Sequence, residues 1–128
     1  MCMPKAEGRK YEFQDESVID TDVLETLPYE GRDQTVTIDT IEFSAVCPYS
    51  GLPDYGEIKI EYIPSDKIVE LKSLKYYFIS YRNVGIYQEK ATDRIYGTIK
   101  ELLSPKWLKV NLRYNTRGGL DVTCEMED

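Results

Sequence analysis

Apolar and polar positions alternate with a period of two in the stretch QTVTIDTIEFSAV, between Gln34 and Val46, as in a β-strand. The alternation changes phase near residues 39–40, which predicts a β-bulge there. In the next alternating stretch, YGEIKIEYIP (55–64), Ile58, Ile60 and Tyr62 share one face and charged residues occupy the other. We therefore predict two strands joined by the loop at residues 47–54.

The hydrophobic period then changes to that of an α-helix. Residues 67–82 carry apolar side chains three and four positions apart, and so do residues 88–103. The positions concerned are Leu71, Leu74, Phe78 and Tyr81 in the first stretch, and Ala91, Ile95, Ile99 and Leu102 in the second. Residues 64–66 can cap the first helix, and Pro105 stops the second. Two amphipathic helices are therefore expected.

Alternation returns in KWLKVNLRY (106–114), NTRGG (115–119) forms a turn, and LDVTC (120–124) is the expected last strand. The predicted order is ββααββ, an α+β fold with a four-stranded antiparallel sheet and both helices on one face. Residues 1–34 are acidic and irregular, and we interpret them as an arm with one short turn around Val23–Leu27. We expect residues 35–128 to form the folded domain that carries any function, so that a single domain is expected overall. The sheet has two open edges, which favours a homo-oligomer.

Composition limits the classes of partner. The 128 residues are 41% hydrophobic, as in a globular domain, and no run of about 18 apolar residues predicts a membrane span. The N-terminal residues lack the apolar segment of a secretory signal. The net charge of −7 disfavours nucleic acid as a partner.

The cysteines and the lack of histidine restrict the chemistry. Cys2, Cys47 and Cys124 show no C-x-x-C spacing, which argues against a disulfide framework and a cysteine zinc site. A reduced, cytoplasmic setting is the simplest interpretation. With no histidine in the chain, Ser-His and Cys-His catalysis are excluded, and we expect no metal.

Cys47 is the strongest candidate for a nucleophile. It lies in FSAVCPYSGLPDYG (43–56), where Pro48 stiffens the chain and the loop can fold Asp54 back over the thiol. A thiolate is a potent nucleophile, and a nearby carboxyl group can donate a proton to an atom that gains charge. From the pattern alone, Cys47 could equally be a small buried hydrophobic residue.

Two basic features could bind an anion. ELKSLKYY (70–77) places Lys72 and Lys75 on one helix face, which fits either a shared anion or a solvated surface. TRGG (116–119) places Arg117 beside two glycines, where a phosphate could approach the backbone. An ordinary hairpin turn explains the same residues.

Glu89 opens the second predicted helix. A carboxylate in the first turn is usually a favourable partner of the helix dipole. If it points into a cleft, it can instead accept two N–H bonds from a purine-like edge.

These pieces together resemble the QueF family of the single-module type, from about Val23 to Val122. The resemblance rests on EFSAVCPYSGLPDYG, ELKSLKYYFISYRN, the glutamate of YQE, and RGG. It implies an NADPH-dependent oxidoreductase that reduces the nitrile of 7-cyano-7-deazaguanine to 7-aminomethyl-7-deazaguanine, in the queuosine pathway of tRNA modification. It also implies the tunnelling (T-) fold, in which subunit sheets join into barrels and active sites lie between subunits, as a pentamer or decamer.

The resemblance assigns roles to particular residues. Cys47 would attack the nitrile and form a covalent thioimide, and Asp54 would protonate the nitrogen. The residues implied to hold the substrate are Glu70, the Leu71 backbone, Gln88 and Glu89. The residues implied to bind NADPH are Lys72, Ser73, Lys75, Arg117 and Gly118.

The chain departs from the family pattern at two positions. Gln88 stands where members usually have a histidine, so this position cannot titrate. Ala91 stands where some members carry a cysteine that can pair with the nucleophile.

Three other functions compete with the reductase. A T-fold relative that adds ammonia to the same nitrile would need Cys47, Asp54 and Glu89 but not the lysine motif, which is intact here. A zinc-dependent T-fold hydrolase would need ligands that this chain lacks. A non-catalytic ligand-binding oligomer would explain the fold, but not the co-occurrence of these motifs.

Overall fold

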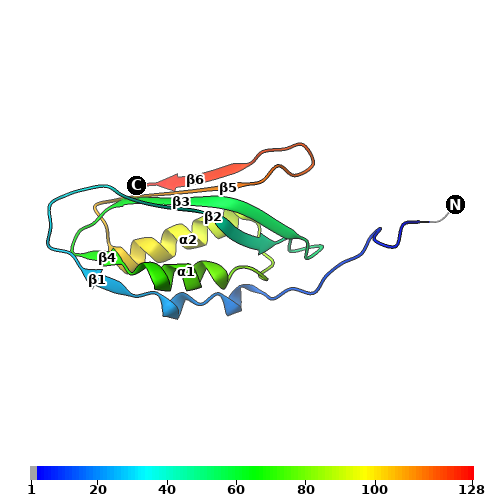
Figure 1. Ribbon diagram of the computed structural model, residues 1–128, viewed down its shortest axis with the longest axis horizontal. Coiled ribbons are helices and arrows are strands. Elements are labelled where there is room, and N and C mark those ends of the chain that lie inside the picture. The colour runs from blue at the N-terminus through cyan, green and yellow to red at the C-terminus, as the bar shows by residue number, and fades with distance from the viewer. Residues whose placement is uncertain (1–2) are drawn as a thin grey trace.

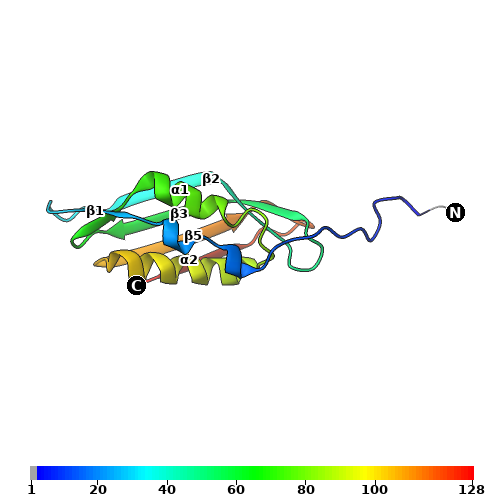
Figure 2. The ribbon, with the colours of Figure 1, turned by 90° about the horizontal axis from the view of Figure 1, so that it is seen from below.

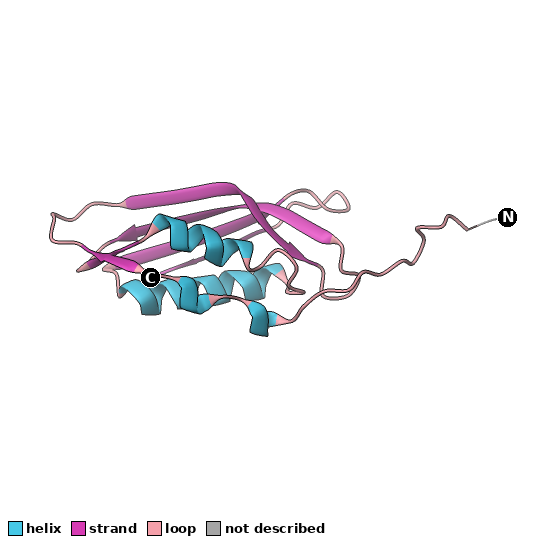
Figure 3. Ribbon diagram, turned by 60° about the horizontal axis from the view of Figure 1, so that its bottom comes forward, coloured by secondary structure: helices cyan, strands magenta, loops and turns pink. Residues whose placement is uncertain are grey.

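The computed structural model describes residues 3–128 and has an α+β fold, as predicted (Figure 1). Its antiparallel sheet has the order β2-β3-β5-β6, and the helices lie on one face (Figures 1 and 3). The strands are β2 (Val36–Val46), β3 (Pro53–Ile63), β5 (Trp107–Tyr114) and β6 (Thr123–Glu127), and the helices are α1 (Leu71–Ile79) and α2 (Gln88–Leu103). The predicted ββααββ order is therefore confirmed for these six elements.

The β-bulge predicted in the first strand is present. The register between β2 and β3 shifts between Thr40 and Phe43. The shift turns the Ile41 side chain outward, where it is 77% exposed, and turns Phe43 fully into the core. The bulge thus sets which side chains of the second half of β2 face the helices.

The core lies between the sheet and the two helices. Alternate residues of β3 and β5 point inward, including Ile58, Ile60, Leu108 and Val110. The helices bury Leu74, Tyr77, Phe78 and Tyr81 from the α1 side, and Ala91, Ile95, Ile99 and Leu103 from α2. Burial of each large apolar side chain contributes about 1.5–3 kcal/mol, so this layer stabilises the scaffold that holds the site.

The first helix is shorter than predicted. Residues 67–69 are strand β4 (Lys67–Val69), and the helix begins only after Glu70, whose side chain accepts hydrogen bonds from the first-turn backbone. Leu71, which was expected to face inward, is 62% exposed, whereas Tyr77 is fully buried. The period of apolar residues identified a helix here but misplaced its first turn.

The N-terminal arm is more regular than predicted. It contains two 3₁₀ turns, η1 (Glu16–Val18) and η2 (Thr21–Val23), and strand β1 (Thr26–Pro28), which pairs antiparallel with β4. Ile19 is buried in the core. The arm crosses the helices on the side away from the sheet (Figure 2). The single short turn expected around Val23–Leu27 is partly right, since the turn η2 ends at Val23. Thr26–Pro28 is a strand instead, because its partner β4 lies about 40 residues away.

The last strand begins three residues later than predicted. Arg117 and Leu120 exchange two backbone hydrogen bonds of 3.0 Å across Gly118 and Gly119, whose φ angles are 57° and 76°. Two successive positive φ angles define a tight hairpin turn that suits glycine. This turn displaces the start of β6 to Thr123.

No helix among residues 3–128 is long and apolar enough to cross a membrane.

Candidate active site

Cys47 lies directly after β2, at the start of a closed turn. Its N–H donates to the carbonyl oxygen of Leu52 at 2.9 Å, and its own carbonyl oxygen accepts from the Gly51 N–H at 2.9 Å. Gly51 has φ 73°, a left-handed conformation that glycine adopts without strain. The turn at residues 47–52 therefore fixes the backbone of Cys47 and returns the chain to β3. Cys47 and Cys124 are free thiols, and Cys2 lies outside the described residues.

The turn also favours the thiolate form of Cys47. Hydrogen bonds from the Ser50 hydroxyl and the Ser50 backbone N–H lower the pKa of the Cys47 thiol, and the Tyr49 N–H contributes in the same direction. Partial burial and the charge of Asp54 act against this, but the pKa remains lowered overall. A lower pKa gives a larger thiolate fraction near neutral pH. The sequence analysis did not identify Ser50, although a hydroxyl three residues after a cysteine was the available signal.

Asp54 lies on β3, where its Cα is paired with Ala45 of β2. Its side chain is 13% exposed, and its Oδ1 atom accepts a hydrogen bond from Arg117 Nη1 at 3.2 Å. Asp54 and Cys47 line the same cavity of about 500 Å³. The other lining residues are Pro48, Ser50, Leu52, Pro53, Tyr87, Arg117, Leu120 and Val122. The structure thus places the predicted nucleophile and the predicted proton donor in one cavity.

Arg117 is held on three sides in this cavity. Besides its ion pair with Asp54, its Nη2 atom donates to Gln88 Oε1 at 3.0 Å. Its guanidinium lies 4.7 Å from the centre of the Tyr114 ring, within the range of a cation–π contact. Arg117 therefore borders Cys47 and Asp54 rather than the lysines with which it was expected to bind the cofactor.

Gln88 is buried, with 3% exposure, and each of its amide groups has a partner. Its Nε2 atom donates to the carbonyl oxygens of Leu112 at 3.0 Å and Val122 at 2.8 Å. Its Oε1 atom accepts the bond from Arg117. Gln88 thus fastens α2 to the β5–β6 hairpin and orients Arg117. A contact between Gln88 and substrate stays a prediction.

Glu89 is exposed in the first turn of α2 and does not line the Cys47 cavity. Burial raises the pKa of the Cys124 thiol, and the negative charge of Glu89 raises it further. Glu89 therefore lies on the side of α2 that faces β6, with its carboxylate open to solvent.

The lysine motif borders a second cavity. A groove of about 490 Å³ lies between α1 and β2, lined by Ile38, Thr40, Glu42, Leu71, Leu74, Lys75, Phe78 and Ile79. Lys72 and Lys75 are exposed, and neither makes a salt bridge within residues 3–128. An unpaired Lys75 amine beside an apolar groove, with Lys72 on the same helix, fits a cofactor that carries both phosphates and flat rings. No residue lines both this groove and the Cys47 cavity.

Two further residues of the motif are engaged in capping α1. The Glu70 carboxylate accepts from the N–H groups of Lys72 at 2.8 Å and Ser73 at 2.9 Å. The buried Ser73 hydroxyl donates to the Glu70 carbonyl oxygen at 2.7 Å and accepts from the Glu25 N–H at 3.0 Å. Their contacts with substrate and cofactor stay predictions, as does that of the Leu71 backbone. Gly118 is unobstructed, since an added Cβ would meet no atom within 4 Å.

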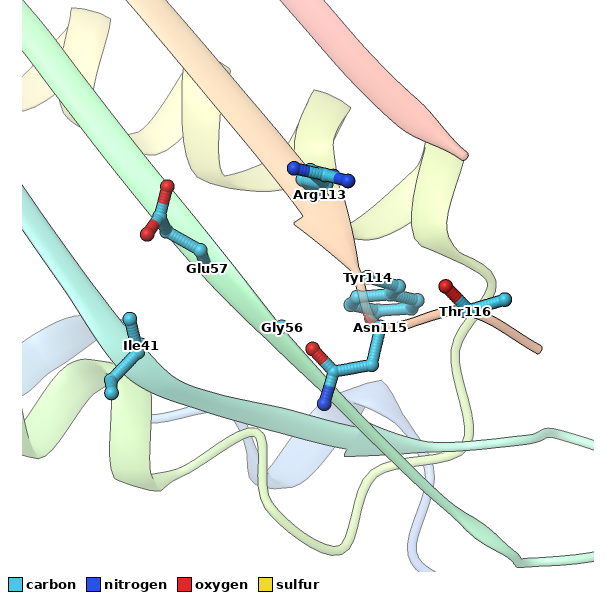
Figure 4. Close-up of a pocket in the computed structure, with 7 residues that line it drawn as sticks. All are labelled: Ile41, Gly56, Glu57, Arg113, Tyr114, Asn115 and Thr116. Carbon is cyan, nitrogen blue, oxygen red and sulfur yellow. The ribbon is translucent and has the colours of Figure 1, made fainter. Parts of the chain in front are cut away.

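A third cavity, of about 390 Å³, lies near the ends of β3 and β5 (Figure 4). It is lined by Ile41, Gly56, Glu57, Arg113, Tyr114, Asn115 and Thr116. None of the residues predicted to act on substrate or cofactor borders it. We therefore take the Cys47 cavity as the candidate active site.

The sequence of this chain is similar to those of known proteins. A family model described as "QueF-like protein" matches residues 53–128. A Thermotoga maritima protein named "NADPH-dependent 7-cyano-7-deazaguanine reductase" is 57% identical over 97% of this chain and 91% of its own length. A protein of the same name from Caldicellulosiruptor bescii is 48% identical, over 91% of this chain and 90% of its own.

Among solved structures, the apo form of an archaeosine synthase QueF-Like superposes with a TM-score of 0.68 at 27% identity. The superposition covers 73% of this chain and 91% of the archaeosine synthase chain. The shared architecture is the T-fold expected from the sequence.

Proposed function

The chain belongs to the QueF family, and from this premise we propose that it reduces the nitrile of 7-cyano-7-deazaguanine to a primary amine with NADPH. The product is 7-aminomethyl-7-deazaguanine, an intermediate of the queuosine pathway. One observation carries the proposal: a thiol with a lowered pKa and a carboxyl group line the same cavity.

Cys47 starts the reaction as a nucleophile. Its sulfur attacks the nitrile carbon, a C–S bond forms, and one π-bond of the nitrile breaks toward nitrogen. Asp54 takes up the proton that leaves the Cys47 thiol and passes it to this nitrogen, which gives a neutral thioimide. No electrons are transferred in this step, so it can occur without the cofactor.

Reduction of a nitrile to an amine takes four electrons. NADPH, when bound, supplies them as two hydrides, one per cofactor molecule. We assign its phosphates to Lys75, which borders the apolar groove, and to Lys72 on the same helix, with Ser73, Arg117 and Gly118 as further candidates. Cys47 is regenerated when the C–S bond breaks, and it must stay reduced to act again. We therefore place the enzyme in the cytoplasm.

We assign recognition of the guanine-like edge first to Glu89. Its carboxylate is exposed, whereas that of Glu70 already accepts two backbone N–H groups. A carboxylate can accept two parallel N–H bonds from such an edge. Glu70, the Leu71 backbone and Gln88 remain candidates for additional contacts.

We further propose that the active site is completed by a second subunit of a homo-oligomer, a pentamer or decamer. Within one chain, the Cys47 cavity and the lysine groove share no residue. The sheet ends in two open edges, β2 and β6, and the groove lies beside one of them. Exposed Ile41, Leu71 and Ile79 lie on β2 and α1, the two elements that form the groove, and give this surface apolar character. Joining edges between subunits would bring the groove of one chain to the Cys47 cavity of the next.

The alternative is addition of ammonia to the same nitrile. The structural likeness to an archaeosine synthase keeps this alternative open. The unpaired lysines beside the groove favour the reductase, because ammonia addition uses no phosphate-bearing cofactor.

Oxidation of NADPH with and without 7-cyano-7-deazaguanine tests the proposal. The reductase should consume about two NADPH per nitrile, because each cofactor carries two electrons, and the product should gain four hydrogens. Consumption of nitrile with ammonia and without NADPH would instead establish the alternative.

A further inference from the structure

The segment at residues 10–14 of the N-terminal arm lies against the turn that carries Cys47. The Tyr11 N–H donates to the carbonyl oxygen of Ser50 at 2.8 Å. The Lys10 amine lies 4.1 Å from the centre of the Tyr49 ring. A Cβ added to Gly51 would lie 2.3 Å from the Tyr11 carbonyl oxygen, so the two backbones are in close contact.

The same segment also holds the chain on the other side of Cys47. The Gln14 N–H donates to the carbonyl oxygen of Asn83 at 2.8 Å, and the Gly85 N–H donates to the carbonyl oxygen of Gln14 at 2.9 Å. Neighbouring Val84 in turn accepts from the N–H of Val46, the residue before Cys47, at 3.0 Å. Residues 10–14 thus bridge the turn that carries Cys47 and the segment at residues 83–85 that pairs with Val46.

Phe13 fills the space between these segments. A Cβ added to Gly85 would lie 2.3 Å from the Phe13 ring and 3.1 Å from the Cα of Pro48. The ring therefore packs directly on Gly85, close to the residue that follows Cys47.

We propose that residues 10–14 act as a strap that positions the Cys47 turn for attack on the nitrile. The strap acts through Ser50, because the arm binds the carbonyl oxygen of the residue whose hydroxyl and N–H face the Cys47 sulfur. Tyr11 and Phe13 are positioning residues, since neither lines the cavity. The inference rests on the proposed role of Cys47 as nucleophile and adds the arm to the machinery of that site.

If the strap holds Ser50 in place, the fraction of Cys47 present as thiolate depends on the arm. Loosening the strap frees Ser50 to move from the sulfur, which removes the largest contribution that lowers the pKa of the thiol. The other ionisable groups that line the cavity are Asp54 of β3, Arg117 of the β5–β6 hairpin and Tyr87 before α2. Of these groups, Asp54 acts on the pKa of Cys47 through its charge. It lies on β3, to which residues 10–14 make no hydrogen bond, so its influence should persist.

Alkylation of Cys47 by iodoacetamide across pH tests the strap in the full-length protein, with peptide mass spectrometry to separate Cys47 from Cys2 and Cys124. Tyr11→Pro removes the N–H donor, and Tyr11→Ala is the matched control that keeps it. Phe13→Ala removes the ring, and Phe13→Leu is the control that largely refills the space. We expect Tyr11→Pro and Phe13→Ala to react about three- to tenfold more slowly at neutral pH, equivalent to a rise in pKa of roughly half to one unit.

Both controls should follow the profile of the unaltered protein, and thermal unfolding should show that each variant is folded. Native alkylation profiles in folded Tyr11→Pro and Phe13→Ala would overturn the proposal, as would an equal loss in Tyr11→Ala. If Tyr11→Pro does not fold, the alkylation profile of Phe13→Ala alone tests the strap. The assay uses no nitrile, so a failure of the strap is distinguishable from a failure of the proposed reaction, which would show as a missing adduct with 7-cyano-7-deazaguanine.

Discussion

At the scale of single residues, the site depends on side chains that bind the backbone as much as on those that meet substrate. Cys47 and Asp54 were identifiable from sequence, because a cysteine after an apolar strand and a carboxylate on the following loop are local features. The residues that hydrogen-bond to the site residues were not identifiable from sequence. Gln88 reaches the carbonyl oxygen of Val122 and the side chain of Arg117, and such contacts follow from packing between distant segments.

Replacement of Gln88 by histidine should destabilise the protein. The amide donates two hydrogen bonds and accepts one at the same time, whereas a neutral imidazole donates one and accepts one. One buried carbonyl oxygen would lose its donor, so Gln88→His should lower the free energy of unfolding by about 1–3 kcal/mol. Urea denaturation measures this loss. A fully stable variant whose turnover gains a titration near the histidine reference value of about 6.5 would contradict this account.

Removal of the Ser50 hydroxyl should raise the pKa of Cys47, because the side-chain hydrogen bond from Ser50 is the largest contribution that lowers it. Titration of the thiolate by its ultraviolet absorbance should therefore place the midpoint of Ser50→Ala at higher pH than that of the unaltered protein. Below that midpoint the variant would hold less thiolate. Ser50→Thr keeps the hydroxyl and is the control. A midpoint unchanged in Ser50→Ala would show that the serine side chain does not act on the sulfur.

At the scale of elements, strands and helices with strong local periods were predictable and their ends were not. β3, α2 and β5 lie close to their predicted positions, because amphipathic alternation and the Pro105 stop are read directly from the sequence. β1 and β4 were missed, since three-residue strands have no detectable period and exist through their pairing. The start of α1 was misplaced because the Glu70 side chain, rather than residues 64–66, caps it.

Loss of the Glu70 carboxylate should weaken α1. Two first-turn N–H groups would lose their acceptor, so Glu70→Ala should lower the free energy of unfolding by about 1 kcal/mol, a typical value for loss of a helix cap. Glu70→Asp retains a carboxylate of the kind that caps helices well, and should lose less. If Glu70→Ala unfolds like the unaltered protein but binds 7-cyano-7-deazaguanine more weakly, the carboxylate serves the substrate rather than the helix.

At the scale of the whole molecule, the two halves of the proposed site are separate within one chain. Cys47 and Asp54 line one cavity, and Lys75 lines another, between α1 and β2. The sequence analysis identified both Cys47–Asp54 and the lysine motif. It could not show that they line separate cavities of one chain, because that separation depends on where α1 begins and which strand it covers.

Mixed oligomers test whether neighbouring subunits share a site. Cys47→Ala and Lys75→Ala should each be strongly impaired alone. After the two are unfolded and refolded together in equal amounts, about one quarter of the sites should pair an intact Cys47 with an intact Lys75 from a neighbour, and activity should return in proportion. Refolding each variant with itself is the control. A mixture no more active than its two components would place the complete site within one chain.

The most direct test of the central claim is intact-mass spectrometry of the protein with 7-cyano-7-deazaguanine and no NADPH. Attack by Cys47 on the nitrile releases no leaving group, so the account predicts a gain of one whole substrate mass per chain. The adduct should be absent in Cys47→Ala, and addition of NADPH to the native adduct should discharge it as the amine. No mass gain in the native protein, or the same gain in Cys47→Ala, would contradict the account.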